Sequence, residues 1–402
     1  MNRTVYLDNF ATTKPAEEVL EGMLPYFREI FGNALSPYDL GQRAREAVEE
    51  ARVVVAELIK AKPQEIIFTS GGTESNNMAI VGLAKANKKK GNHVIVSTVE
   101  HHSITNPARH LEREGFEVTF LPVDRYGVID LNFLERALRE DTVLVSVQLA
   151  NPEVGTIQPV KEVVRLAKRV GALVHTDAVA AIPQMKVDVD DLGVDALSLS
   201  AHLFYGPKGA GALYLRKGVR VQPIIYGGIQ EGGRRGGTEN VPAIVGMGIA
   251  ARLLRQNLPT MVPKMQALRD RLIKGLLERI PNLHLTGHPE KRLPGHASFI
   301  VEFVEGEAML LMLAFKGIYT SSGSTCSSKA LKASPVLSSM GYPAHLIQGS
   351  ILFVLSKDTQ EEDIDYVLNT MPEVVERLRE LSPFKEGWKD MEKWEKATCP
   401  HH

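Results

Sequence analysis

The feature that most constrains this chain is an alternation, between about residues 66 and 215, of short apolar runs with segments of helical periodicity. The apolar runs are rich in β-branched residues and lie at 66–69, 94–97, 118–121, 143–147, 173–176 and 196–199. Strands that are apolar throughout are covered on both faces, which is typical of a mostly parallel sheet flanked by helices. Right-handed crossovers then bring the carboxyl ends of the strands, and any ligand, to one edge of the sheet.

The periodicity changes after about residue 250. Apolar residues recur there at spacings of three and four, which predicts a long amphipathic helix through Met265, Leu268, Leu272 and Leu276. Two strand-like segments near 297–303 and 350–355 and a helix at about 361–381 follow. Because 402 residues exceed the usual size of one core, we predict two domains. The large α/β domain spans 15–250, and a smaller α+β domain combines 1–14 with 251–402.

Charge and cysteine content limit the partners and the location. Lys and Arg total 47 against 48 Asp and Glu, so no basic surplus indicates nucleic acid or an anionic membrane as a partner. The most apolar run, 241–254, is too short to span a bilayer. The chain begins without an apolar signal core, and two cysteines, Cys326 and Cys399, cannot form a disulfide framework. We therefore expect a cytoplasmic protein.

Three polar segments directly follow predicted strands. The segment 70–77 (SGGTESNN) could bind an anion at the start of a helix, or Thr73 could simply cap that helix. Asp177 could hold the ring nitrogen of a cofactor or cap the next helix. His202, in 200–203 (SAHL), is either a binding residue or a satisfied core histidine. Each segment alone leaves both interpretations open.

Two loops rich in small residues complete the set of motifs. The segment 227–238 (GGIQEGGRRGGT) would by itself pass as a flexible surface loop. The segment 321–328 (SSGSTCSS) places Cys326 among small polar residues, with no apolar packing partners nearby in sequence. Most free cysteines are buried and inert, but this setting favours an exposed and reactive thiol.

The order and spacing of these segments resemble the cysteine desulfurases, which are pyridoxal 5′-phosphate (PLP) enzymes of aminotransferase fold type I. The resemblance covers essentially the whole chain. The segments of this chain that match the family's motifs are DNFATT, SGGTESNN, EHHS, NPEVG, DAVA, SAHLFYGPKG, GGIQEGGRRGGT and SSGSTCSS.

The resemblance implies a set of cofactor contacts. It places the PLP phosphate on Thr73, Ser200 and His202. It implies that His101 stacks on the pyridine ring and that Asp177 pairs with the ring nitrogen.

The resemblance also implies partners and a sulfur acceptor. Thr238 would reach the phosphate from a second subunit, which implies a homodimer. Cys326 would take sulfur from cysteine as a persulfide, the role of an activated nucleophile. The family passes that sulfur to iron–sulfur scaffold proteins or to tRNA-modifying enzymes, so we expect a scaffold protein or another sulfur acceptor as partner.

The chain departs from the family's pattern at four positions of the site. Leu203 stands where the Schiff-base lysine directly follows the histidine, and Leu352 where an arginine binds the substrate carboxylate. Pro152 replaces an asparagine of the NNExG motif, and Ala180 a glutamine of DAxQ. General base catalysis contributes about 10²–10⁴ in rate, and leucine supplies none. Loss of the arginine forfeits roughly 1.5–3 kcal/mol of hydrogen bonding.

Three hypotheses follow from these departures. In the first, the chain is an impaired desulfurase of sulfur transfer or iron–sulfur assembly that acts through Cys326 and scaffold binding, with PLP bound non-covalently or not at all. In the second, it is an active cysteine desulfurase that uses non-covalent PLP and another base such as His101. In the third, the fold is repurposed for a different ligand.

A further expectation concerns metal binding. We expect no metal site, although Cys326 could serve as a thiolate ligand to an iron–sulfur cluster on a partner. For the last four residues, 399–402 (CPHH), we favour docking of a partner over a dedicated metal site.

Overall fold

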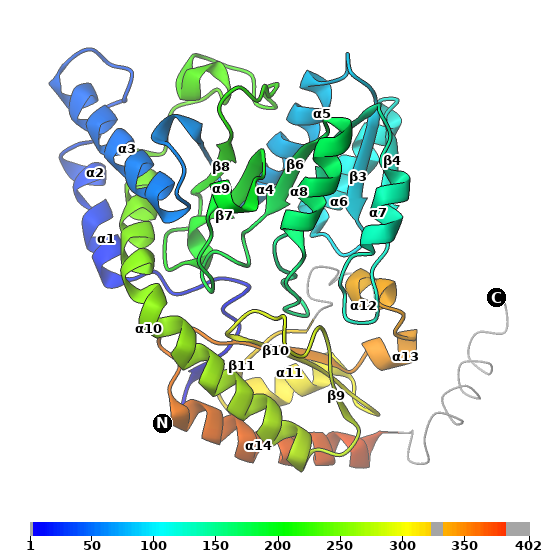
Figure 1. Cartoon of the computed structure of the whole chain (residues 1–402). Helices are drawn as coiled ribbons and strands as arrows, with labels where there is room; N and C mark the ends of the chain where they lie inside the picture. The colour runs from blue at the N-terminus through cyan, green and yellow to red at the C-terminus, as the bar shows by residue number, and fades with distance from the viewer. Residues whose placement is uncertain (1–2, 323–332, 383–402) are drawn as a thin grey trace.

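The core of the fold is a seven-stranded sheet, seen in a computed structural model that describes residues 3–322 and 333–382 (Figure 1). The strand order is β2-β8-β7-β6-β5-β3-β4, and only β8 runs antiparallel to its neighbours. The strands are β2 (Ile66–Thr69), β3 (His93–Ser97), β4 (Glu117–Leu121), β5 (Thr142–Ser146), β6 (Leu173–Asp177), β7 (Ala196–Ser200) and β8 (Gly211–Leu215). The predicted mostly parallel α/β sheet is thereby confirmed, and the six strands predicted for it lie within one residue of their observed bounds.

Helices cover both faces of this sheet. Consecutive residues of β3 point to opposite sides, because Val94 and Val96 pack in one apolar core and Ile95 in the other. The first core holds residues of η2, α5 and α6, and the second holds residues of α3, α7, α8 and α10. The helical segments of this part are α1 (Glu17–Met23), α2 (Pro25–Arg28), α3 (Asp39–Leu58), η1 (Pro63–Glu65), α4 (Gly72–Asn77), η2 (Met78–Gly82), α5 (Leu83–Ala86), α6 (His102–Arg113), α7 (Leu131–Ala137), α8 (Val160–Ala167), η3 (Lys168–Val170), α9 (Val189–Leu192), η4 (Ala201–Leu203) and η5 (Gln230–Gly233).

One long helix, α10 (Val241–Arg279), connects the sheet to the rest of the chain. It packs on α1 and α3 near its start and on α14 near its end, as Figure 1 shows. The predicted apolar stripe is buried on this helix at Met265, Leu268, Leu272 and Leu276. The helix runs unbroken through residue 250, so the division of the chain into domains at that position stays a prediction.

The remaining elements build two small sheets with their covering helices. One sheet has the order β12-β10-β9, and the other pairs β1 with β11 in parallel, so the beginning of the chain joins its last third. The elements are β1 (Val5–Tyr6), β9 (Leu283–Leu285), β10 (His296–Val301), α11 (Gly306–Phe315), β11 (Ile318–Tyr319), α12 (Pro335–Ser339), α13 (Ala344–Ile347), β12 (Ser350–Val354) and α14 (Glu361–Leu381). The predicted helix at 361–381 is confirmed at both ends.

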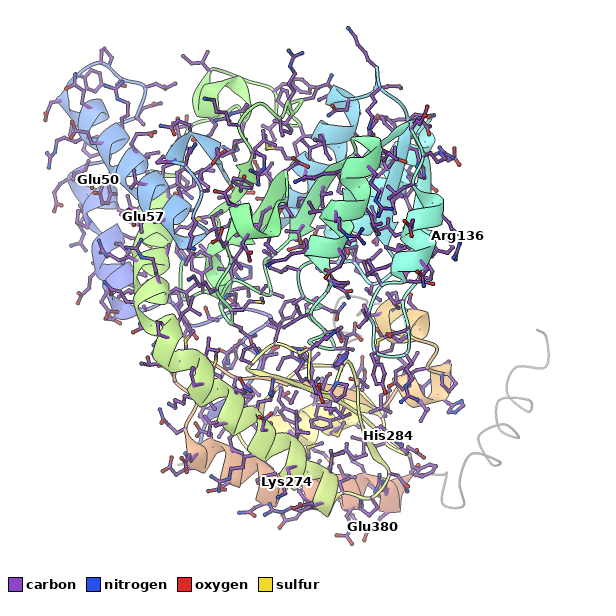
Figure 2. The ribbon with its side chains drawn as sticks, viewed as in Figure 1. Glu50, Glu57, Arg136, Lys274, His284 and Glu380 are labelled. Carbon is purple, nitrogen blue, oxygen red and sulfur yellow. The ribbon has the colours of Figure 1, made fainter. Side chains whose placement is uncertain are left out.

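The outer faces of the helices are charged. Figure 2 shows Glu50 and Glu57 on α3, Arg136 on α7 and Lys274 on α10, and all four are exposed. None of the helices in the described ranges is both long and apolar enough to cross a membrane.

A close backbone approach fixes the turn after β2. A Cβ atom on Gly211 of β8 would lie 2.5 Å from the Cα atom of Gly71, which is closer than real Cβ atoms come. Only glycine therefore lets β8 run directly beside the turn that begins α4.

A buried ion pair holds the glycine-rich loop against the sheet. The Arg52 guanidinium of α3 donates to both Glu231 carboxylate oxygens, at 2.7 and 2.8 Å. The backbone N–H of Phe68 in β2 donates to the same carboxylate at 2.9 Å. Arg52 and Glu231 are each 9% exposed, so the pair is shielded from water. The segment, which by itself would pass as a flexible surface loop, is therefore anchored at Glu231.

Replacing Glu231 by alanine should lower the free energy of unfolding by about 3–5 kcal/mol, because it leaves the buried Arg52 without this carboxylate. Urea denaturation followed by circular dichroism measures the loss. The control is Asp191→Ala, which breaks an exposed pair with Lys161 and should cost less than about 1 kcal/mol. Equal losses in the two variants would contradict the anchoring role of Glu231.

Candidate active site

A cavity of about 280 Å³ lies where β6 and β7 end, at the edge of the sheet expected to bind ligands. It brings together five of the six residues predicted to contact the cofactor: Thr73, His101, Asp177, Ser200 and His202. The sixth, Thr238, is exposed and does not line this cavity. Cys326 and the segment 399–402 lie outside the described residues.

The carboxyl group of Asp177 is the buried acid of this cavity. One oxygen accepts from the backbone N–H of Val179 at 2.9 Å, and the other from the Asn76 amide at 2.7 Å. Burial raises the pKa of Asp177, while these two hydrogen bonds and nearby His101 act in the opposite direction. The interpretation of Asp177 as the cap of the next helix is wrong, because only a turn follows β6 and the next helix, α9, begins at Val189 with Asp188 as its N-cap. Asp177 instead accepts within that turn and lines the cavity, which is compatible with the cofactor role.

His101 directly precedes α6 and lines the same cavity. Its Nδ1 accepts from the backbone N–H of Ser103 at 3.1 Å, so the side chain serves as the N-cap of the helix. This bond places the proton of the neutral ring on Nε2. Burial lowers the pKa of His101, which favours the neutral ring.

The turn after β2 contributes small groups to the cavity. Gly72 and Thr73 line it, together with Ser200 at the end of β7. The helix begins at Gly72 with Gly71 as its N-cap residue, so the interpretation of Thr73 as the cap is wrong. The reason is that the chain enters the helix two residues earlier, through the glycine pair. Ser200 is 2% exposed, and its Oγ has no hydrogen-bond partner among the described residues.

The beginning of the chain braces the turn that follows β7. Thr13 donates from both its backbone N–H and its hydroxyl to the carbonyl oxygen of His202, at 2.9 and 2.8 Å. The backbone N–H of Tyr205 donates to the Thr13 hydroxyl at 2.8 Å. His202 Nδ1 lies 3.3 Å from the Thr12 hydroxyl, and burial lowers the pKa of this histidine. His202 is therefore a partly exposed cavity residue and not a core histidine.

Apolar side chains occupy the positions of two expected charges. Leu203 is 3% exposed and lines the large cavity beside His202. Leu352, on β12, is 4% exposed and lines a second cavity of about 80 Å³. Phe10, His101 and Pro152 belong to both linings, so the cavities adjoin. No lysine or arginine lines either cavity in the described part of the chain.

Several polar residues of the site were not predicted from the sequence. Asn76 connects Asp177 to Ser103, whose hydroxyl lies 2.7 Å from His101 Nδ1. Gln148 lines the large cavity, and Glu100 and Glu153 line the small one. Four of these five stand inside the quoted motifs, but a motif does not tell which of its members face a ligand.

The large cavity fits PLP in its chemistry. The unpartnered Ser200 hydroxyl, with Thr73, His202 and the backbone around Gly72, offers donors to a phosphate. Asp177 offers a buried carboxylate to a protonated ring nitrogen, and His101 offers an aromatic face. Leu203 cannot supply the amine of an imine.

Comparisons with known proteins agree with the fold. The chain matches the aminotransferase class-V family over residues 5–367. It is 49% identical to a protein named cysteine desulfurase IscS from Methanosarcina thermophila, over 95% of this chain and 94% of that protein. A protein of the same name from Dictyoglomus turgidum is also 49% identical, over 97% and 99% of the two chains. A solved NifS-like protein superposes with a TM-score of 0.88 at 38% identity, over 94% of this chain and all of that chain. The chain therefore belongs to the aminotransferase class-V family.

Proposed function

We propose that this chain is a PLP-dependent cysteine desulfurase, which converts cysteine to alanine and transfers the sulfur to Cys326. The observation that carries the proposal is the cavity at the ends of β6 and β7, which gathers a phosphate-binding turn, a buried carboxylate and a histidine. The names of the curated relatives support this second hypothesis of the sequence analysis better than the first, an impaired desulfurase.

The residues of this chain would hold the cofactor without a covalent bond. Thr73, Ser200 and His202 would bind the phosphate, and Asp177 would keep the ring nitrogen protonated. PLP, when bound, supplies an electron sink for the bonds around the α-carbon of an amino acid. Thr238, which is exposed here, would bind the phosphate in the partner subunit of a homodimer.

Proton transfer is the step that lacks an obvious group. In the second hypothesis His101 takes the α-proton. Its Nδ1 lone pair already accepts from Ser103, so His101 acts as a base only from the other tautomer or after releasing that hydrogen bond. The cost of this rearrangement reduces the roughly 10²–10⁴-fold acceleration that an optimally placed base contributes. We therefore propose a slow enzyme.

A specific observation favours a second candidate function. Leu203 and Leu352 remove the amine and the cation while the groups for phosphate and ring nitrogen are kept. An impaired desulfurase would receive its sulfur from elsewhere, or would present the Cys326 thiolate to a cluster on an iron–sulfur scaffold protein. The two candidates differ in whether the natural protein releases sulfur from cysteine.

Cofactor binding is tested first. PLP should bind to the purified protein and shift its visible spectrum, and borohydride should leave the protein mass unchanged because no lysine forms an imine. Leu203→Lys should gain the mass of reduced PLP. Asp177→Ala should bind PLP roughly 10–150-fold more weakly, since it loses a charge-assisted hydrogen bond. Borohydride fixation of PLP to the natural protein would contradict the non-covalent site.

Turnover separates the two candidates. Alanine released from cysteine and PLP should exceed the amount formed without protein. Leu203→Lys combined with Leu352→Arg should raise that rate by about 10²-fold or more, because it restores a base and a carboxylate ligand. Leu203→Met, which adds no amine, is the matched control. Alanine from the double variant and none from the natural protein would favour the impaired desulfurase.

Cys326 is tested separately from PLP. Cys326→Ser should bind PLP with unchanged affinity, because the residue is not among the proposed cofactor contacts, and it should carry no persulfide after incubation with cysteine. Mass spectrometry of the peptide that contains residue 326 measures the added sulfur, and Cys399→Ser serves as control. A persulfide on Cys399 in place of Cys326 would overturn the assignment.

A further inference from the structure

The small cavity beside Leu352 contains two carboxyl groups and no described cation. It is about 80 Å³ in volume, and its lining includes Glu100, Glu153 and Leu352. It shares Phe10, His101 and Pro152 with the proposed cofactor cavity. This is the side on which the resemblance expects an arginine for the substrate carboxylate. If the substrate carboxylate binds in this cavity, it must therefore do so without an arginine or lysine from the described residues.

Glu100 is held with one oxygen directed away from its donors. Its Oε1 accepts from the Ser97 hydroxyl at 2.6 Å and from the backbone N–H of Gln148 at 2.8 Å. Its Oε2 is buried and has no hydrogen-bond partner in the described ranges, although the residue is only 5% exposed. Because Oε1 accepts both hydrogen bonds, a proton on this carboxyl group would lie on Oε2.

Glu153 is arranged in a similar way. Its carboxyl group hydrogen-bonds to Ser334, and its Oε1 is buried and has no partner among the described residues. Burial raises the pKa of both Glu100 and Glu153 to about 8, so both groups are mainly neutral at pH 7. A carboxylic acid kept neutral by burial can donate a hydrogen bond to an anion.

The titratable groups around the two glutamates in the described residues are histidines and acids, with no lysine or arginine in the lining. His101 and His102 line the cavity from the start of α6, and burial lowers the pKa of His101. Asp177, at the end of β6, raises the pKa of Glu100 further through its charge. Asp8, which follows β1 and hydrogen-bonds to Ser321 of the lining, has its own pKa raised by burial to about 6.

We propose that Glu100 and Glu153 bind the carboxylate of the amino-acid substrate as neutral acids, each donating one hydrogen bond in place of the absent arginine. Hydrogen bonds from O–H to a carboxylate are short and strong, which suits a small cavity. The inference rests on the proposed function for the identity of the substrate. The binding site itself needs neither the cofactor nor turnover.

The test uses 3-hydroxypropionate, which carries the hydroxyl and carboxylate of serine but no amine, and its uncharged amide as the comparison ligand. Binding to the full-length protein without PLP is measured by ligand-observed NMR titration at pH 7 and pH 9.5. One and a half pH units above a pKa of about 8, only about 3% of a carboxyl group is neutral, so affinity for the acid should fall about 30-fold for each of the two carboxyl groups that must be neutral, and at least about 30-fold in all. Affinity for the amide should not fall.

Substitutions of the two glutamates distinguish the loss of a hydrogen-bond donor from the gain of a negative charge. Glu153→Gln and Glu100→Gln keep a neutral donor that does not titrate, so each should retain binding at pH 7 and reduce the loss at pH 9.5. Glu153→Leu removes the donor and should weaken binding at pH 7 by about 10-fold or more. Glu112→Gln, on the exposed face of α6, is the matched control. Melting curves confirm that each variant is folded.

Two results would overturn the inference. In the first, the natural protein binds 3-hydroxypropionate equally well at pH 7 and pH 9.5. In the second, the Glu153→Leu and Glu100→Leu variants bind 3-hydroxypropionate as tightly as the natural protein does. Failure of the proposed function looks different. In that case cysteine and PLP yield no alanine, while 3-hydroxypropionate still binds with the expected pH dependence.

Discussion

The buried carboxyl group of Asp177 is the interaction on which the site depends. It stands at the end of β6, where it accepts from the Val179 backbone of its own turn and from the Asn76 amide of the distant α4. Asn76 also donates to the Ser103 hydroxyl, and Ser103 in turn contacts His101. A buried acid without such donors would be costly, so the positions of α4 and of the start of α6 are coupled to this one group.

The two adjoining cavities differ in how they could hold charge. The larger one has hydrogen-bond donors near Ser200 that could bind an anion and a carboxylate at Asp177 that could bind a protonated ring nitrogen. The smaller one has two acids, two histidines and two serines among apolar residues in its lining, and Leu352 occupies part of its wall. The departures from the family's pattern fall in both cavities, because Pro152, Ala180 and Leu203 line the larger one and Pro152 and Leu352 the smaller one. The groups proposed to bind the phosphate and the ring nitrogen are kept in the same larger cavity.

The sheet could be predicted from the sequence because its strands are apolar on both faces, and this pattern depends only on local composition. β8 escaped the prediction, since Gly211 and Ala212 make its start look like a turn, and its place in the sheet is set by contact with Gly71. The anchoring of the glycine-rich loop escaped for the same reason. Arg52 and Glu231 are 179 residues apart, and no local pattern connects them.

The site could likewise be predicted only in part from the sequence. The motifs named residues that could bind PLP, because phosphate and ring nitrogen require particular chemical groups, and five of those residues line one cavity. The motifs could not reveal the state of Glu100 or Glu153, because that state is set by burial, which outweighs donors such as Ser97 and Gln148 that favour the anion of Glu100. Sequence identifies a carboxyl group, but only the packing around it decides whether the group is an anion or a hydrogen-bond donor. For a chain that has lost its expected cation, that difference decides which substrates the cavity can accept.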